Sequence, residues 1–410
     1  MMLPVKEAES IIMNLVQPLD NQRDVEIVDL FAATGRILAT AVRSELNFPH
    51  WDNSAMDGYA VRYADVQNAS EENPAILEVI EEISAGYQPK QTIHKGQTAR
   101  ILTGAVMPIG ADTIVIQELV RRQGNQVFVL ATPKPQEFVR HKGEFYQAGA
   151  QLLPGGIRLS APEIAALAAA QCSQLSVYRK PKVAVLSTGN ELVTPDQPLK
   201  AGQIVDSNQY ALASVIIQSG AEPLMLGIVK DEPEALTQAM AIALQSADVV
   251  ISSGGVSVGD YDYVEKLLES NGGTIHIRSV AVKPGKPLTV ASFEDKLYFG
   301  LPGNPVSALV TFWRFVQPAI KKLAGISQDW KPKFIIARTH YDLHSDGKRE
   351  SYLWGKLDIV DGIYEFHLAG GSHSSGNLIN LAQTNALGIV PIGQTLIPKG
   401  EEIQVMLVDL

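Results

Sequence analysis

The chain has 410 residues, more than one hydrophobic core usually holds, so we expect two to four domains. Hydrophobic residues make up 46% of it and charged residues 19%, a balance that excludes an intrinsically disordered chain. The formal net charge of −10 argues against a broad nucleic-acid surface, because neutralising many phosphates requires a basic face.

Cysteine content and hydropathy narrow the class of protein further. Cys172 is the only cysteine, which excludes an internal disulfide and a thiolate metal site within one chain. The first nine residues lack the apolar segment of a secretory signal, and no apolar stretch reaches the roughly 18 residues of a membrane-spanning helix. We therefore expect a cytoplasmic enzyme that has neither a nucleic acid nor a membrane as a partner.

The first half of the chain reads as a β-rich domain between two helical pieces. Residues 5–15 carry apolar side chains at three- and four-residue steps, which predicts an amphipathic helix, and a second helix follows Ser160. Short apolar runs broken by glycine and proline lie between them. We expect segments 1–46 and 147–179 to pack together as one segmented helical domain, with a β-rich domain at 47–146 inserted into it.

Residues 180–326 show the alternation of an α/β domain. The apolar runs at 183–186 and 224–229 and the segment Asp248-Val249-Val250-Ile251 predict buried strands, with helices between them, and therefore a doubly wound parallel sheet. Ligands of such sheets bind outside the carboxyl ends of the strands, so the loops there should share one rim. Residues 327–410 alternate apolar and polar without a convincing helix, which indicates a small β-barrel or sandwich, and we take the C-terminal β-barrel as the prediction.

Two features of the predicted rim indicate phosphate chemistry. The stretch 252–262 is rich in glycine and hydroxyl side chains, so its backbone N–H groups can approach an anion, although an ordinary tight turn explains it equally well. It lacks the spacing of a dinucleotide or Walker motif. Three carboxylates, Glu191, Asp231 and Asp262, should project from the same rim. Each alone reads best as a helix cap, but together they would repel one another unless they held Mg²⁺.

The segment Lys283-Pro284-Gly285-Lys286-Pro287 is the most informative loop. Two prolines stiffen it and the glycine allows a tight reversal, so two ammonium groups are presented close together, where they favour an anion between them. A solvated basic turn is the alternative interpretation. Farther on, Ser307 is expected to begin a helix whose N-terminus can also bind an oxyanion.

Taken together, these motifs resemble the molybdopterin molybdenumtransferase family, which includes the molybdenum-inserting half of gephyrin. The resemblance rests on the lysine loop and on five further segments in the order that the family shows: 52–62 (DNSAMDGYAVR), 100–105 (RILTGA), 187–192 (STGNEL), 253–259 (SGGVSVG) and 302–307 (PGNPVS). It runs from the first helix to the C-terminus.

The resemblance implies a reaction and an assembly. Family members convert adenylylated molybdopterin and molybdate into molybdenum cofactor and AMP, assisted by Mg²⁺. They are four-domain homodimers in which the segment matching 52–60 approaches the partner's α/β domain, and an upstream adenylyltransferase is a possible further partner. Two alternatives stay open: an adenylyltransferase acting one step earlier on the same pterin, and a scaffold or cofactor carrier without turnover.

The resemblance also assigns site residues by motif. Those implied to bind the substrates are Lys283, Lys286, Pro287, Asn304, Ser307, Arg349 and Ser375, together with Gly254, Gly255, Ser257 and Gly259 of the glycine loop. Those implied in catalysis are Asp57, Thr103, Glu191, Asp231 and Asp262, of which the last three are the candidate metal ligands.

Several positions depart from the family pattern. Phe145 stands where the family usually has an aspartate, and Trp354 where it has an arginine; Asn190 replaces an aspartate and Ala386 a glycine. A phenylalanine cannot ligate a metal or act as a base. We expect the lysine loop to hold the oxyanion and the acidic rim to handle the phosphate, while Phe145 removes one carboxylate that the family pattern includes.

Overall fold

A computed structural model of the chain describes residues 2–254 and 261–408, without the side chains of residues 261–263. The chain forms two compact units: one comprises residues 1–40, 155–164 and 174–410, and the other comprises residues 41–154 and 165–173. This division is coarser than the four domains expected from the sequence, whose boundaries stay a prediction. Among the described residues, none of the helices combines the length and the hydropathy that a membrane-spanning helix requires.

The larger unit contains a six-stranded sheet. Its strand order is β16 (Glu222–Val229), β13 (Lys182–Thr188), β17 (Val249–Ser253), β21 (Lys296–Leu301), β20 (Pro287–Phe293) and β18 (Thr274–Ser279). The first four strands are parallel to one another, as predicted. β20 runs antiparallel to its neighbour β21, and the edge strand β18 runs antiparallel to β20. β20 and β21 run in opposite directions because only the two-residue turn 294–295 joins them, and such a short connection is possible only between antiparallel neighbours.

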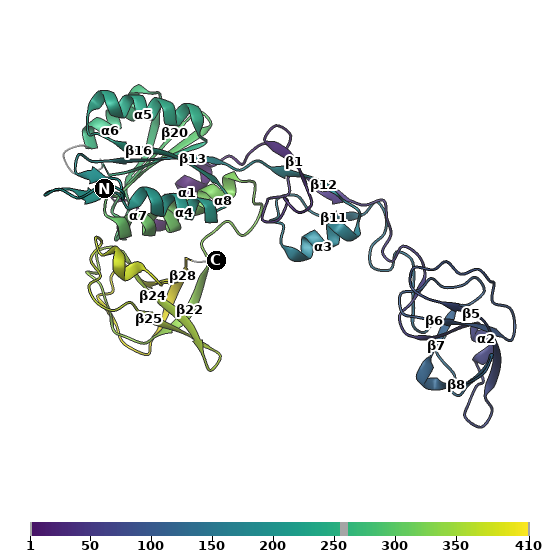
Figure 1. The fold of residues 1–410 in the computed structure, drawn as a ribbon. Coiled ribbons are helices and arrows are strands. Elements are labelled where there is room, and N and C mark those ends of the chain that lie inside the picture. Colours follow the sequence, from purple (N-terminus) through teal and green to yellow (C-terminus); the bar gives the residue numbers. More distant parts are fainter. Residues whose placement is uncertain (1, 255–260, 409–410) are drawn as a thin grey trace. The chain divides into compact units, whose positions relative to one another are not determined.

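Helices cover both faces of this sheet (Figure 1). One face carries α5 (Pro233–Ser246) and α6 (Tyr261–Ser270); the other carries α1 (Val5–Leu15), α4 (Asn208–Gln218), α7 (Pro305–Thr311), the π-helical turn η2 (Phe312–Val316) and α8 (Gln317–Leu323). The strands alternate accordingly: Val183 and Val185 of β13 join the core on the α1 side, and Ala184 and Leu186 join the core below α5. Both faces are therefore buried, which explains the continuous apolar runs.

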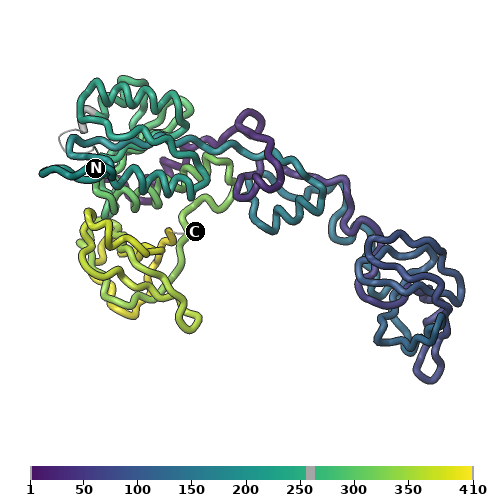
Figure 2. The backbone as a smooth tube through the Cα atoms, viewed as in Figure 1, coloured from purple at the N-terminus to yellow at the C-terminus, as the bar shows by residue number. Residues whose placement is uncertain are grey.

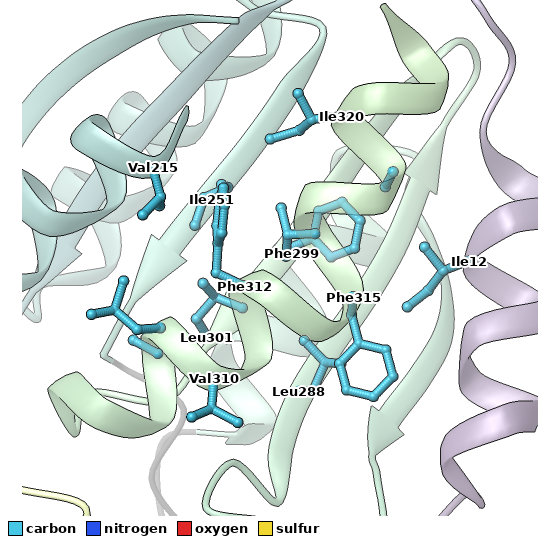
Figure 3. Close-up of a cluster of buried hydrophobic side chains, with 14 of the residues drawn as sticks. Ile12, Val215, Ile251, Leu288, Phe299, Leu301, Val310, Phe312, Phe315 and Ile320 are labelled. Carbon is cyan, nitrogen blue, oxygen red and sulfur yellow. The ribbon is translucent and has the colours of Figure 1, made fainter. Parts of the chain in front are cut away.

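The first helix packs differently from our expectation. Val5, Ala8 and Ile12 of α1 are buried in the α/β core, where Ile12 lies in one cluster with Ile251 and Phe315 (Figure 3). In Figure 2 the N-terminal segment accordingly runs among the helices of this domain. Strand pairs, rather than packed helices, join the two flanking segments. These pairs are β1 (Val25–Asp29) with β12 (Gln174–Tyr178), and β2 (Val42–Arg43) with β11 (Gln151–Leu153), while α3 spans Ala161–Ala169.

The inserted region is β-rich, as predicted. Its six-stranded sheet runs β7 (Thr113–Ile116), β4 (Gly58–Val61), β6 (Gln97–Ile101), β5 (Ala75–Ile83), β9 (Gln126–Val129) and β8 (Val120–Gln123). Two hydrophobic clusters flank the sheet. The remaining elements there are β3 (Asn53–Ser54), α2 (Tyr63–Val66), η1 (Gln117–Leu119) and β10 (Val139–Arg140).

The C-terminal region forms the predicted barrel. Its strands are β24 (Glu350–Val360), β25 (Ile363–Leu368), β22 (Phe334–Thr339), β28 (Glu402–Leu407) and β26 (Ala386–Val390), and β26 pairs back to β24. Closure removes the exposed edges that a five-stranded sheet would otherwise present. The chain also forms β14 (Leu192–Val193), β15 (Ile204–Val205), β19 (Val282–Lys283), β23 (Leu343–His344), β27 (Leu396–Ile397) and η3 (Leu378–Leu381).

Candidate anion-binding site

The lysine loop connects the α/β sheet to the barrel. After β18 the chain leaves the sheet, and β19 pairs in parallel with the barrel strand β24, with Val282 opposite Glu350 and Lys283 opposite Ser351. The chain then returns to the sheet as β20. Nothing in the sequence indicates that the segment before the loop pairs with a strand of the barrel. This exchange places the loop against barrel residues.

A cavity of about 520 Å³ lies between the loop, the start of α7 and the barrel. This volume is within the usual range for small-molecule sites. The structure places seven candidate residues in its lining: Lys283, Lys286, Pro287, Asn304, Ser307, Arg349 and Ser375. Ser307 is the third residue of α7, which begins at Pro305 rather than at Ser307.

Gly285 sets how closely the loop approaches α7. Its φ is +114°, and a Cβ built on it would lie 2.5 Å from Cγ2 of Thr311. Both the backbone angle and the space therefore require glycine here. The loop is held against the helix that carries Ser307, so its shape is determined by packing as well as by its prolines.

The cationic side chains of the cavity differ in whether they form ion pairs with a carboxylate. The carboxylate of Asp346 lies 3.1 Å from the Lys283 ammonium and 3.2 Å from the Arg349 guanidinium. A backbone N–H bond from Lys348 and these two cations hold the pKa of Asp346 well below its usual range. Lys286 has no ion-pair partner in the part of the chain that the structure describes. The cavity therefore carries more positive than negative charge, which favours an anion.

Two polar atoms of the cavity lining are buried without hydrogen-bond partners among the described residues. They are Nε1 of Trp354, whose side chain is 1% exposed, and Nδ1 of His373. The two rings lie 4.6 Å apart, and His373 Nε2 is 2.7 Å from the Ala369 carbonyl oxygen. Buried polar atoms almost always have partners, so these atoms point to a ligand. Sequence reasoning noted Trp354 only as a departure and missed His373, because its partners become apparent only in the fold.

A second cavity, of about 200 Å³, opens at the carboxyl ends of β13 and β17. Thr188, Asp231 and Gly254 contribute to its rim, while its walls are largely apolar. The hydroxyls of Ser187 and Thr188 are buried without partners among the residues described. Gly254 has a φ of +91°, and a Cβ there would lie 2.5 Å from the Thr188 carbonyl oxygen, so this backbone approach requires glycine.

Of the three carboxylates predicted at the carboxyl ends of the strands, the structure describes the side chains of Glu191 and Asp231. Glu191 lies outside the lining of the second cavity, and its carboxylate lies over Gly189. The backbone N–H of Asp231 donates to Asn190 Oδ1 at 3.4 Å, which brings the two loops together. Gly255, Ser257, Gly259 and the side chain of Asp262 lie outside the described residues. Within those residues, Glu191 and Asp231 do not form a three-ligand cluster.

The two cavities adjoin across the turn at Pro302–Asn304. A Cβ on Gly303 would lie 3.5 Å from Cα of Gly254, which lines the second cavity. Asn304, the next residue, lines the first cavity and donates from Nδ2 to Ser375 Oγ at 3.0 Å. Buried Asn208 holds the turn, because its Nδ2 donates to Ser253 Oγ at 2.7 Å and to the Gly303 carbonyl at 2.8 Å. No motif in the sequence indicates this role of Asn208.

The inserted β-rich unit brings Asp57 and Thr103 together. Asp57 Oδ1 accepts hydrogen bonds from the Thr103 backbone N–H at 2.8 Å and from its hydroxyl at 2.7 Å. These two bonds lower the pKa of the Asp57 carboxyl, so it is ionised at neutral pH. In the same unit the Phe145 side chain is 69% exposed.

Fold and site together define the class: a multidomain α/β protein whose sheet and β-barrel enclose a cationic cavity. Three family models match the chain: the MoeA N-terminal region (domain I and II) at residues 3–170, a probable molybdopterin binding domain at 184–322, and the MoeA C-terminal region (domain IV) at 337–408.

Similar proteins span nearly the whole chain. A molybdopterin molybdenumtransferase of Nostoc sp. is 64% identical over 405 residues, which cover 98% of this chain and 93% of the relative. One of Haemophilus influenzae is 36% identical, covering 90% of this chain and 88% of its own. The crystal structure of the molybdopterin biosynthesis moeA protein from Pyrococcus horikoshii OT3 has a TM-score of 0.85 and 28% identity, over 99% of this chain and 100% of that one. The chain belongs to the molybdopterin molybdenumtransferase family, which confirms the prediction from its motifs.

Proposed function

We propose that this protein transfers molybdenum from molybdate to adenylylated molybdopterin, with release of AMP. The observation that carries the proposal is the cationic cavity lined by a buried Trp354 N–H that has no partner among the described residues; this cavity adjoins a second, largely apolar cavity across one turn. A reaction between an oxyanion and a pterin adenylate needs two such neighbouring sites.

In this proposal the larger cavity binds molybdate. Molybdate is a tetrahedral dianion with four acceptor oxygens, so it requires cations and donors on several sides. Lys286 supplies a charge without an ion-pair partner among the described residues, and Arg349 supplies a planar set of N–H donors from the barrel. Ser307 offers a hydroxyl from α7. Pro287, Asn304 and Ser375 shape the same wall.

In this proposal the second cavity holds the ring system of the pterin adenylate, and the glycine-rich segment 254–259 binds its phosphates. Apolar walls suit a ring system, and backbone N–H groups of the segment 254–259 suit phosphate oxygens. Glu191, Asp231 and Asp262 offer carboxylate oxygens, the donor type that Mg²⁺ prefers, so the residues fit this ion in kind. Bound there with phosphate oxygens, Mg²⁺ would neutralise charge on the pyrophosphate.

We also propose that the protein acts as a homodimer. A homodimer would bring Asp57 and Thr103 to the partner's α/β domain, where the ionised Asp57 carboxylate could accept a proton or orient water. We further propose a cytoplasmic location and substrate delivery by the upstream adenylyltransferase. Light scattering of the purified chain tests the dimer directly: a monomer at working concentration would overturn it.

The alternatives are less well supported. A stand-alone adenylyltransferase would need neither the inserted β domain nor the barrel, whereas relatives named molybdopterin molybdenumtransferase match 98% and 90% of this chain. A scaffold without turnover is motivated only by Phe145.

A coupled assay tests the proposal. Purified protein is incubated with adenylylated molybdopterin and Mg²⁺, with and without molybdate, and AMP and molybdenum-loaded pterin are quantified by chromatography and mass spectrometry. We expect both products to depend on molybdate and to be lost in Lys286→Ala. The exposed barrel residue Lys399 supplies the matched control, Lys399→Ala. Pterin adenylylation from ATP in place of AMP release would favour the adenylyltransferase.

A further inference from the structure

A cluster of three potential metal ligands lies on the barrel, outside the linings of both cavities. His340, Glu365 and His367 each offer one ligand atom, and these atoms lie within 4.8 Å of one another. Glu365 and His367 are two residues apart on β25, so their side chains project from the same face of the strand. His340 follows directly after β22, the neighbouring strand.

The distances are close to those of a metal site. Oε2 of Glu365 lies 3.8 Å from Nδ1 of His340 and 3.6 Å from Nε2 of His367. The two imidazole rings are 4.7 Å apart between centroids. Around a tetrahedral ion with bonds of about 2.1 Å, neighbouring ligand atoms lie about 3.4 Å apart. The two distances from Glu365 Oε2 to the histidine nitrogens therefore need to shorten by only a few tenths of an ångström when an ion binds.

Backbone hydrogen bonds of the barrel hold the ligands in place. The His340 N–H donates to the Phe366 carbonyl at 2.9 Å, between Glu365 and His367 in sequence. Glu365 and His367 lie within the regular pairing of β24 with β25, opposite Asp358 and Lys356. A site on paired strands keeps its ligand spacing better than a site on loops, because the strand register fixes each residue.

Two cationic side chains stand opposite the cluster on the neighbouring strands. Arg338 of β22 is paired with Glu365 in the strand register, but it is exposed and forms no ion pair with Glu365 within the described residues. Lys356 of β24 is paired with His367, and its ammonium lies 3.2 Å from a carboxylate oxygen of Asp358. The Glu365 carboxylate therefore contacts the two histidines rather than either cation. The side chains of His340 and His367 are 44% and 32% exposed, which leaves room for water or another ligand at the open positions of an ion.

The cluster also bridges the shortest strand pairing of the barrel. β22 and β25 pair only at Arg338 with Glu365 and at Thr339 with Phe366, whereas β24 and β25 pair continuously from Gly355 to Val360. His340 stands on one side of this short pairing and Glu365 and His367 on the other. An ion bound to all three would cross-link the barrel where hydrogen bonding holds it least.

We propose that His340, Glu365 and His367 bind one divalent transition-metal ion of the Zn²⁺ class, which stabilises the barrel at the β22–β25 pairing. Imidazole ligands suit Zn²⁺, Ni²⁺ and Cu²⁺, whereas Mg²⁺ requires oxygen ligands. This site is therefore distinct in chemistry from the acidic rim. It does not depend on the proposed molybdenum transfer.

Titration of the untagged full-length protein with Zn²⁺, after removal of metals by a chelator, tests the site. We expect calorimetry to show one ion bound per chain, and Co²⁺ to give the visible absorption of a four- or five-coordinate site. His367→Ala and the nearly isosteric Glu365→Gln should each lower the affinity at least about tenfold, since even changes in outer-shell groups of metal sites cost 10- to 100-fold. The exposed residue His94 supplies the control, and His94→Ala should bind as the wild type does.

Thermal unfolding supplies a second readout. Saturating Zn²⁺ should raise the Tm of the wild type and of His94→Ala, but not that of His367→Ala, because only a folded state that binds the ion is stabilised. Excess Mg²⁺ should not displace Zn²⁺ from the cluster. Binding below one ion per chain, or equal Zn²⁺ affinity in the wild type and both cluster variants, would overturn the proposal, and circular dichroism checks that each variant is folded.

Discussion

The ammonium of Lys283 lies 3.1 Å from the carboxylate of Asp346, which pairs an anion of the barrel with the first cation of the lysine loop. The same carboxylate contacts Arg349 at 3.2 Å, so it links two candidate anion ligands from different parts of the chain. Lys286, three residues along the loop, has no such partner among the residues that the structure describes. The two lysines of one short loop should therefore contribute unequally to anion binding.

Lys286→Ala should weaken molybdate binding more than Lys283→Ala does. A hydrogen bond to a charged group contributes about 1.5–3 kcal/mol, so the loss at Lys286 should be roughly 10- to 100-fold in affinity. At Lys283 it should be smaller, because Asp346 already neutralises part of the charge. Calorimetric titration with molybdate measures both, with Lys399→Ala as the control. Equal affinity in the Lys286→Ala variant and the wild type would contradict this ranking.

Asp346→Asn should reduce stability at neutral pH but not in acid. The folded-state pKa of Asp346 is lowered by the Lys348 backbone N–H and by Lys283 and Arg349, so its ionised form stabilises the fold above the ordinary carboxyl pKa. That contribution is lost as the pH falls from the ordinary value through the lowered one. The Tm difference between wild type and variant should shrink over this range. Asp361→Asn, on an exposed turn of the same barrel, serves as the control; a difference independent of pH would refute the assignment.

Trp354→Phe separates a ligand contact from a packing role. The substitution keeps an aromatic ring in the buried position but removes Nε1, a donor without a partner among the described residues. Leaving a buried donor unsatisfied costs about 1–3 kcal/mol. Without ligand, the phenylalanine variant should therefore be at least as stable as the wild type. If molybdate accepts this hydrogen bond, its affinity should fall at the same time. Unchanged affinity with raised stability would show that the N–H does not contact the substrate.

Gly285→Ala should distort the lysine loop. Its Cβ would meet Thr311 Cγ2 at 2.5 Å, and a φ of +114° is strained for any residue with a side chain. Such strain and overpacking cost about 1–3 kcal/mol each, so both the Tm and molybdate affinity should fall. Thr311→Ser removes the clashing methyl group, so the double variant should recover part of the loss. No recovery would assign the whole effect to the backbone angle.

Phe145→Asp restores the carboxylate that the family pattern leads us to expect. Phe145 is 69% exposed, so the change should not disturb the fold, and we expect faster AMP release with little change in the KM for molybdate. Tyr87, 67% exposed in the same unit, provides the matched control Tyr87→Asp. Equal rates in both variants and the wild type would mean that position 145 does not limit the reaction.

The layered α/β domain, the β-rich insertion, the C-terminal barrel and the family could all be predicted from the amino-acid sequence. These follow from local patterns: apolar runs such as 183–186 form strands buried on both faces, and motifs such as 302–307 carry backbone geometry with them. Such signals are contained in neighbouring residues and need no knowledge of distant contacts.

The contacts between groups that are distant in sequence became apparent from the three-dimensional fold. It paired Lys283 with Asp346, placed Asn208 behind the Gly303 turn, put α1 in the sheet core, and set His340 beside Glu365 and His367. None of these contacts is marked in the sequence, because each joins segments that are far apart along the chain, and two of them depend on strand register, that of β19 with β24 and that of β22 with β25. Strand register is set by burial and backbone hydrogen bonding over the whole sheet, and a shift of one residue would send every side chain to the opposite face.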